Sequence, residues 1–136
     1  MRVYSLALII ACVCMILLVP GGSAHHSAAE YDRTKSITMP ATVVEFHYAN
    51  PHPLLFVDGK ESNGNVVRWT IEIGPNPAEL LRMGWDKKRS EAALAAGAMI
   101  TVTVTPSKMN PSVGIATKII TGDGEQVFGG AIRLQN

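Results

Sequence analysis

Short stretches of alternating apolar and polar residues, separated by turn-forming residues, run through most of the chain from residue 37 onwards. The clearest stretch is 66–73, which places Val67, Trp69, Ile71 and Ile73 on one face and Arg68, Thr70 and Glu72 on the other. The stretch 99–105 repeats the pattern and turns Ile100, Val102 and Val104 inward. Such alternation is typical of strands with one buried and one solvated face.

Three further stretches predict strands of less regular pattern. In residues 37–48, one parity holds Thr42, Val44, Phe46 and Tyr48, and the other holds Val43, Glu45 and His47. A bend at Asn50-Pro51 precedes a strand at 54–57, which Asp58-Gly59 is expected to end, and Ser62-Asn63-Gly64-Asn65 predicts a hairpin turn. The weaker candidates are 113–121 and 126–134, separated by a turn at 122–124.

One helix is marked at both ends. Asn76 is a suitable cap, Pro77 suits the first turn, and Glu79 lies three residues after the cap, where it can reach back to the cap amide. Leu80, Leu81 and Met83 supply an apolar side, and Gly84 ends the helix. Residues 86–96 predict a second short helical segment.

The order is three strands, a helical connection, and two or three more strands. This order predicts a mainly β fold: a small OB-like barrel of five to six antiparallel strands with a helix after the third. Closure would also remove the exposed edges of short strands. A small sandwich or roll is the alternative. The barrel domain is expected to cover residues 37–136, after a polar N-terminal arm at 25–36.

The first 24 residues have the three parts of a secretory signal. Arg2 gives a positive start, an apolar run extends over residues 3–19, and Pro20-Gly21-Gly22-Ser23-Ala24 supplies small residues before a cut that leaves His25 first. We therefore expect cleavage and a periplasmic or secreted location. The alternatives are an uncleaved anchor, since the run is just long enough to span a bilayer, and lipidation of Cys12.

Cleavage would leave 112 residues with 11 basic and 11 acidic side chains, because Arg2 is the signal's one charged residue. A neutral exported chain is a poor nucleic-acid binder, since nucleic acid selects basic patches. Both cysteines, Cys12 and Cys14, would leave with the signal, so no disulfide is expected. No membrane span is expected after cleavage.

All four histidines lie in the first half of the expected mature chain: His25, His26, His47 and His52. Imidazole is the commonest protein metal ligand. Four residues separate His47 from His52 across the Asn50-Pro51 bend, so a hairpin would make them cross-strand neighbours, with Glu45 on the face of His47. If His25 is the first residue, its amine and ring can chelate Cu(II) together. If the cut falls one residue earlier, His26 becomes the third residue, and this arrangement also chelates Cu(II).

These features lead to three hypotheses. The first is a periplasmic protein that binds a transition metal, with copper as the first candidate and His25, His26, His52 and His47 as candidate ligands. The second is a non-catalytic OB-like module that binds a small ligand, a peptide or a partner protein. The third is an oxidase with an N-terminal histidine copper site. No catalytic residue is expected, because the chain has no nucleophile-elbow context, phosphate loop or dinucleotide fingerprint.

Several of these residues also carry a resemblance to a known family. His25-His26-Ser27, Tyr31-Asp32, Asn50-Pro51-His52, Trp69 with Glu72, and the stretch from Asn76 through Gly84-Trp85 resemble an uncharacterised group of bacterial secreted domains, the 6152-type family of domains of unknown function. The resemblance implies a small exported β-rich domain without an established activity. It includes His25, His26 and His52, whereas position 47 is more often aromatic or polar in that group.

Overall fold

The computed structural model describes residues 30–128 of the chain. The expected signal at 1–24, the histidines His25 and His26, and residues 129–136 lie outside the described part. The elements in chain order are β1 (Ile37–His47), β2 (Leu54–Lys60), β3 (Val66–Ile73), α2 (Pro77–Arg82), α3 (Lys87–Ala93), β4 (Met99–Pro106), β5 (Val113–Thr121) and β6 (Gln126–Val127).

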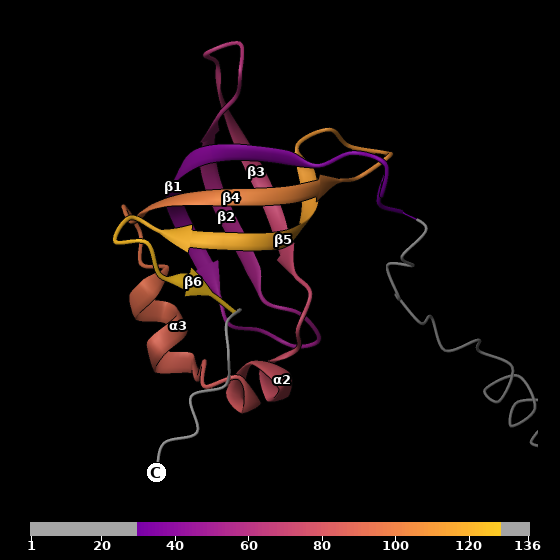
Figure 1. The fold of residues 1–136 in the computed structure, drawn as a ribbon. Coiled ribbons are helices and arrows are strands. Elements are labelled where there is room, and N and C mark those ends of the chain that lie inside the picture. The colour runs from indigo at the N-terminus through magenta and orange to yellow at the C-terminus, as the bar shows by residue number, and fades with distance from the viewer. Residues whose placement is uncertain (1–29, 129–136) are drawn as a thin grey trace, which may run out of the picture.

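Five of the strands close into a barrel, and β6 lies outside it as a sixth strand (Figure 1). β1 pairs with β4 through its first half and with β2 through its second half. β2 then pairs with β3, and β4 with β5, all antiparallel. Residues 70–73 of β3 pair in parallel with residues 113–116 of β5, and this one parallel pairing closes the barrel. The prediction of a small OB-like β-barrel with a helix after the third strand is confirmed. The expectation that all of its strands are antiparallel is wrong at the β3–β5 pairing.

A β-bulge between Val43 and Glu45 reverses which parity of β1 faces the interior. The buried residues upstream of the bulge are Met39, Ala41 and Val43. Downstream, Phe46 packs against the core, whereas Glu45 and His47 are exposed. Val44 is the extra residue that the bulge inserts. The uninterrupted alternation predicted for this stretch is therefore wrong at the bulge, where one face exchanges with the other.

The second strand is longer than predicted, because Asp58 and Gly59 belong to it and do not end it. Gly59 pairs with Ala41 on one side and with Val67 on the other. A Cβ at this position would lie 2.6 Å from the Met39 sulfur, so glycine here makes room for core packing. The turn itself follows at residues 61–65, where Gly64 adopts φ +86° and the Glu61 amide donates to the Asn65 carbonyl.

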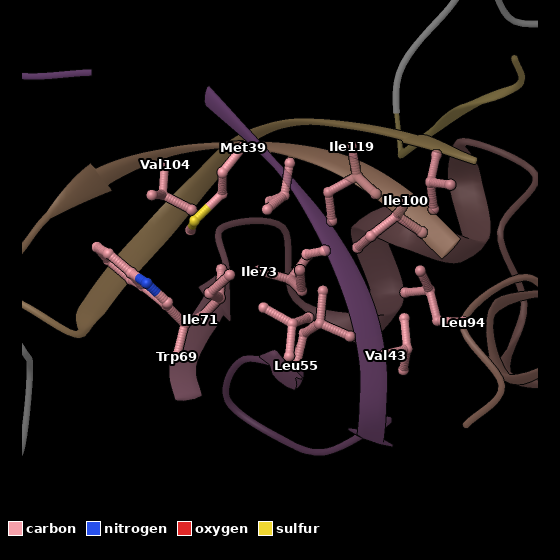
Figure 2. Packing of buried hydrophobic residues seen from close by; sticks show 14 of the residues in the cluster. Met39, Val43, Leu55, Trp69, Ile71, Ile73, Leu94, Ile100, Val104 and Ile119 are labelled. Carbon is pink, nitrogen blue, oxygen red and sulfur yellow. The ribbon is translucent and has the colours of Figure 1, made fainter. Parts of the chain in front are cut away.

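The barrel interior is filled by side chains from all five barrel strands (Figure 2). The largest fully buried residues are Trp69, Met39, Leu55, Ile71, Ile73, Leu80, Leu94, Ile119, Val43, Val57, Val102 and Val104. Trp69 and Trp85 are 1% and 2% exposed, so both belong to the core and do not line a ligand groove. The inward faces predicted for 66–73 and 99–105 are confirmed.

Both predicted helical segments form, and Figure 1 shows them together at one end of the barrel. The Asn76 side chain accepts from the Glu79 amide at 3.0 Å, and the Glu79 side chain accepts from the Asn76 amide at 2.9 Å. Asp86 caps α3 by accepting from the Arg89 amide at 2.8 Å. No helix within residues 30–128 combines the length and the apolar character that a membrane crossing requires. Of the strand predicted at 126–134, the described part contains the short β6.

Candidate functional site

Glu72 lies on the outer face of β3, near the strand's end. The alternation that buries Ile71 and Ile73 turns Glu72 outward, as the sequence predicts. Its cross-strand neighbours are Leu54 on β2 and Ile115 on β5, both of which are half-buried. Apolar flanks of this kind leave the Glu72 side chain only 15% exposed. A carboxylate in that position needs polar partners, because removal from water is costly for a charged group.

The first partner is Tyr31, at the described beginning of the arm. The arm forms an isolated antiparallel bridge between Tyr31 and Ser107, and hydrogen bonds on both sides of this bridge fix its register. The Asp32 amide donates to the Pro106 carbonyl, and the Lys108 amide donates to the Glu30 carbonyl, each at 2.9 Å. The Tyr31 side chain is 8% exposed, and its hydroxyl donates to Glu72 Oε2 at 2.9 Å.

The second partner is His52, in the loop between β1 and β2. This residue follows the cis Asn50–Pro51 peptide bond, and the Ile73 amide donates to the Pro53 carbonyl at 2.9 Å, which ties the loop to β3. His52 Nε2 lies 3.8 Å from Glu72 Oε1, too far for a hydrogen bond. His52 Nδ1 is buried and has no hydrogen-bond partner among the described residues. We call Tyr31, His52 and Glu72 the arm cluster.

Electrostatics in the arm cluster favour a protonated Tyr31. Burial raises the pKa of this phenol well above its usual range, and the hydrogen bond to Glu72 and the charges of Glu72 and Glu30 raise it further. Tyr31 therefore remains a neutral donor over the physiological pH range. One oxygen of Glu72 is occupied by this donor, and the other faces the His52 ring.

His47 lies outside the arm cluster. Its cross-strand neighbour is Leu54, so the prediction that His47 and His52 face each other across the hairpin is wrong. The observed partner, Leu54, is two residues later in the chain than the predicted partner, His52, because residues 48–53 form a loop instead of a tight turn. His47 Nε2 lies 2.6 Å from Glu45 Oε1, as their predicted shared face requires, and the ring packs edge-on against Phe56 at 5.4 Å. Both members of this pair are exposed.

The acidic residues Glu45, Asp58 and Glu72 each have separate partners. Asp58 accepts two hydrogen bonds from Arg68, at 2.6 and 3.2 Å, and these bonds hold the pKa of the Asp58 carboxyl below its usual value. Glu45 pairs with His47, and Glu72 with the arm cluster. Each carboxylate thus has its own partners, so these acids do not form a pair across which a proton could pass directly.

Within residues 30–128, no three histidine, cysteine or acidic side chains gather closely enough to hold a metal ion. The described part of the chain therefore offers His52 and Glu72 as two donor groups. Two ligands that each lie about 2.1 Å from one ion are about 3.4 Å apart at a tetrahedral angle. The 3.8 Å between His52 Nε2 and Glu72 Oε1 is close to that spacing.

A hollow of about 360 Å³ lies beside the arm, between the beginning of β1 and the loop after β4. It is lined by Asp32, Lys35, Ile37, Pro106, Ser107, Lys108 and Pro111. Lys35 Nζ lies 3.2 Å from Asp32 Oδ2 at its edge. The volume is at the lower end of the range for small-ligand sites. The docked arm supplies part of this wall, so one segment shapes both the hollow and the arm cluster.

Reasoning from the sequence found His52 as a candidate ligand but gave no role to Tyr31 and no partner to Glu72. Tyr31 is 41 residues from Glu72 in the chain, and no periodic pattern links them. The useful signal was the resemblance, because Tyr31, His52 and Glu72 all belong to the motifs that carry it. These three residues, far apart in the sequence, lie together in the structure.

Comparison with known proteins gives one positive result. Residues 14–116 match a family of unknown function (DUF6152), which agrees with the resemblance seen in the motifs. The match includes β1 to β4 and all three residues of the arm cluster. Neither the curated proteins nor the solved structures gave a significant match. Because the match covers most of the sequence, the chain belongs to DUF6152, a family of unknown function.

Proposed function

We propose that this small β-barrel domain is exported and binds a transition metal ion, with copper as the first candidate, without catalysing a reaction. His25 and His26 from the arm and His52 from the β1–β2 loop are the proposed ligands. The observation that carries the proposal is the hydrogen bond from Tyr31 to Glu72, at 2.9 Å. This bond docks the arm beside the carboxylate that the His52 ring also faces.

The reach of the chain supports this ligand set. His26 precedes Tyr31 by five residues, and five residues span at most about 17 Å. Both Tyr31 and His52 lie beside the Glu72 carboxylate. The Tyr31 hydroxyl is 2.9 Å from Oε2, and His52 Nε2 is 3.8 Å from Oε1. If the arm binds the ion, its attachment at Tyr31 would raise the effective concentration of both histidines near His52.

Export would complete the donor set. A cut after Ala24 gives His25 a free amine that can chelate together with its ring. A cut one residue earlier makes His26 the third residue, and the amine, the intervening amides and its ring can surround Cu(II) in a square. The intact mass of the protein from its native host tests this step. A mass that retains residues 1–24, or that carries a lipid on Cys12, would contradict it.

Calorimetric titration of the processed protein with Cu(II), Ni(II) and Zn(II) tests metal binding. We expect submicromolar affinity for at least one ion and a loss of at least tenfold in the His25→Ala/His26→Ala/His52→Ala variant. His47→Ala is the matched control, because His47 is also a histidine beside a glutamate but lies outside the arm cluster. Binding weaker than micromolar, or equal affinity in the triple variant, would overturn the proposal.

A non-catalytic binding module is the second candidate, and the hollow beside the arm favours it. This space of about 360 Å³ has a mixed lining of charged, polar and apolar side chains, which suits a small polar ligand with an apolar part; the residues are Asp32, Lys35, Ile37, Pro106, Ser107, Lys108 and Pro111. Amide chemical-shift changes confined to residues 31–37 and 106–111, on titration with small carboxylates and phosphates, would support it. Shifts that spread evenly over the surface lysines would reject a defined pocket.

A further inference from the structure

The tip of the β2–β3 hairpin places an asparagine directly before a glycine, Asn63-Gly64. Both residues are exposed, and Figure 1 shows this tip standing clear of the barrel. The side-chain carbonyl carbon of an asparagine can be attacked by the backbone nitrogen of the next residue, and a side chain on that next residue obstructs the approach. Gly64 carries none, and apart from its chain neighbours no atom lies within 4 Å of the position that a Cβ would take. The approach of the Gly64 nitrogen to Asn63 Cγ is therefore sterically open.

We infer that Asn63 is a site of spontaneous deamidation. The Gly64 nitrogen loses its proton and forms a bond to Asn63 Cγ, the bond from Cγ to Nδ2 breaks, and Nδ2 leaves with that proton as ammonia. Water then opens the resulting five-membered imide at either carbonyl carbon. The products are an aspartate, and an isoaspartate in which the main chain passes through Cβ and Cγ of residue 63. The inference does not depend on the proposed metal binding.

Hydrogen bonds in the turn both favour and delay this reaction. Asn63 Oδ1 accepts from the Asn65 amide at 2.8 Å, and this oxygen gains negative charge when Cγ is attacked, so the donor stabilises the intermediate. The Gly64 amide, however, donates to the Glu61 carbonyl at 2.9 Å, and this bond must break before the nitrogen can lose its proton. An exposed hairpin tip opens at a small cost in free energy. We therefore expect the native protein to react, but more slowly than the unfolded chain.

The other asparagines among the described residues lack this arrangement. Three of them precede a proline, whose nitrogen has no proton to lose, namely Asn50, Asn76 and Asn110. Asn65 precedes Val66, whose branched side chain obstructs the approach. The best match to Asn63 is Asn110, because it is also exposed and its Oδ1 also accepts from the amide two residues later, at 3.0 Å. These two asparagines differ in the residue that follows, so they form a matched pair.

Aspartates that precede a glycine can form the same imide, but the two in this chain are poorly suited to it. An ionised carboxylate resists attack, and hydrogen bonds lower the pKa of both carboxyls, from Arg68 at Asp58 and from Thr121 at Asp123. Asp58 also lies within β2, where the glycine after it is buried and pairs with strands on both sides. The side-chain amide of Asn63 carries no charge, so it needs no protonation before it reacts.

The two products have different consequences for the hairpin. An aspartate at position 63 retains the oxygen that accepts from the Asn65 amide, so the turn should persist with one more negative charge beside Glu61. An isoaspartate adds an atom to the main chain inside the loop that the Glu61 amide closes on the Asn65 carbonyl. We therefore expect the isoaspartate to break that bond and loosen the hairpin.

Peptide mapping of aged protein tests the inference. Wild-type protein, Asn63→Gln and Asn110→Gln are incubated in warm, mildly alkaline buffer, with and without urea, and digested with trypsin, which releases residues 61–68. We expect the wild-type peptide to gain one mass unit at Asn63, as a mixture of aspartate and isoaspartate, at least tenfold faster than any gain at Asn65 or Asn110. Asn63→Gln should abolish this gain, because glutamine must close a larger ring, and the matched control Asn110→Gln should keep the wild-type rate. Urea should accelerate the reaction severalfold, since it frees the Gly64 amide.

The outcomes are distinct from those of the metal titration. An unaged sample accounts for changes during digestion, and thermal unfolding verifies that both variants are folded. No mass gain at Asn63 in the aged wild-type protein, or an equal gain at Asn110, would overturn the inference. An equal rate in native protein and in urea would contradict the protection assigned to the bond from Gly64 to Glu61. Because no metal ion takes part, a failure here leaves the proposed function untouched.

Discussion

Two regions of the barrel gather aromatic and polar side chains, and they differ in how completely those groups are paired. The helix-covered end, which we define by Tyr48, Trp85, Arg89 and Phe128, lies beside α2 and α3. The Tyr48 hydroxyl lies within hydrogen-bond distance of the Pro77 and Trp85 carbonyls, at 3.1 and 3.3 Å. Arg89 lies over the Trp85 ring at 3.9 Å, and Phe128 packs edge-on against that ring at 5.4 Å.

Arg89 completes the contacts within the helix-covered end. Its guanidinium donates to the Gly84 carbonyl at 2.8 Å and to Glu125 at 2.7 Å, besides lying over Trp85. The arm cluster is less complete, because His52 Nδ1 has no partner among the described residues and Nε2 stops 3.8 Å from Glu72. The comparison indicates that the polar groups of the helix-covered end are paired, whereas His52 in the arm cluster has ring nitrogens without a hydrogen-bond partner among the described residues. Substitutions should therefore separate folding from binding.

The largest effect on stability is expected for Trp85→Ala. Trp85 is 2% exposed, and removing a buried tryptophan typically costs about 3–5 kcal/mol in the free energy of unfolding. Urea unfolding, followed by the fluorescence of the remaining Trp69, measures this loss, while metal affinity of the folded protein should not change. A loss below about 1 kcal/mol, or a tenfold loss of metal affinity, would contradict the division between the two regions.

Removal of either tyrosine hydroxyl should lower the free energy of unfolding by less than Trp85→Ala does. Tyr31→Phe removes a hydrogen bond to a charged acceptor and should cost about 1.5–3 kcal/mol. Tyr48→Phe removes a bond to neutral carbonyls and should cost about 0.5–1.5 kcal/mol. Chemical denaturation of the two single variants gives both values. If Tyr48→Phe is the more costly change, Glu72 does not hold the arm as strongly as the 2.9 Å contact indicates.

These two regions also show how far the sequence alone predicts structure and site. Local signals carried most of the fold: the alternation over 66–73 and 99–105, and the cap residues Asn76 and Glu79, gave strands and a helix that the structure confirms. The bulge after Val43 and the close approach of Met39 to Gly59 were not predictable. Each depends on a contact between two strands, and alternation within one strand contains no information about it.

The candidate site was less predictable than the fold, for the same reason. His47 and Glu45 share a face because they are two residues apart, and this pair was predicted. His52 meets Glu72 only after the hairpin places the loop beside β3, and Tyr31 meets it only after the arm pairs with residue 107. Such long-range contacts follow from barrel closure, so single-sequence patterns could name His52 but not its neighbours.

The helix caps give a still smaller effect within the helix-covered end. Asn76 and Glu79 cap α2 reciprocally, whereas Asp86 caps α3 through one side-chain bond. Asn76→Ala and Asp86→Ala should each cost about 1 kcal/mol, as for typical N-cap residues. The two costs should be similar, because each substitution removes one side-chain acceptor and the Glu79 side chain keeps its bond to the backbone amide of residue 76. Thermal or urea unfolding measures both. A much larger loss in Asn76→Ala would show that the two bonds of the capping box depend on each other.

The smallest effect is expected at Asp58 and Arg68, an exposed pair that belongs to neither region. Hydrogen bonds from Arg68 lower the pKa of the Asp58 carboxyl. A group whose pKa is lower in the folded protein contributes stability above its unfolded pKa, and that contribution disappears as the pH falls through the folded value. An NMR titration of Asp58 should therefore show a midpoint below its usual value, and Arg68→Ala should raise it.

Because the pair touches neither Glu72 nor Trp85, this variant should keep wild-type metal affinity. A changed affinity would mean that charge elsewhere on the outer face reaches the arm cluster, so that the two regions are not the only determinants of binding and stability.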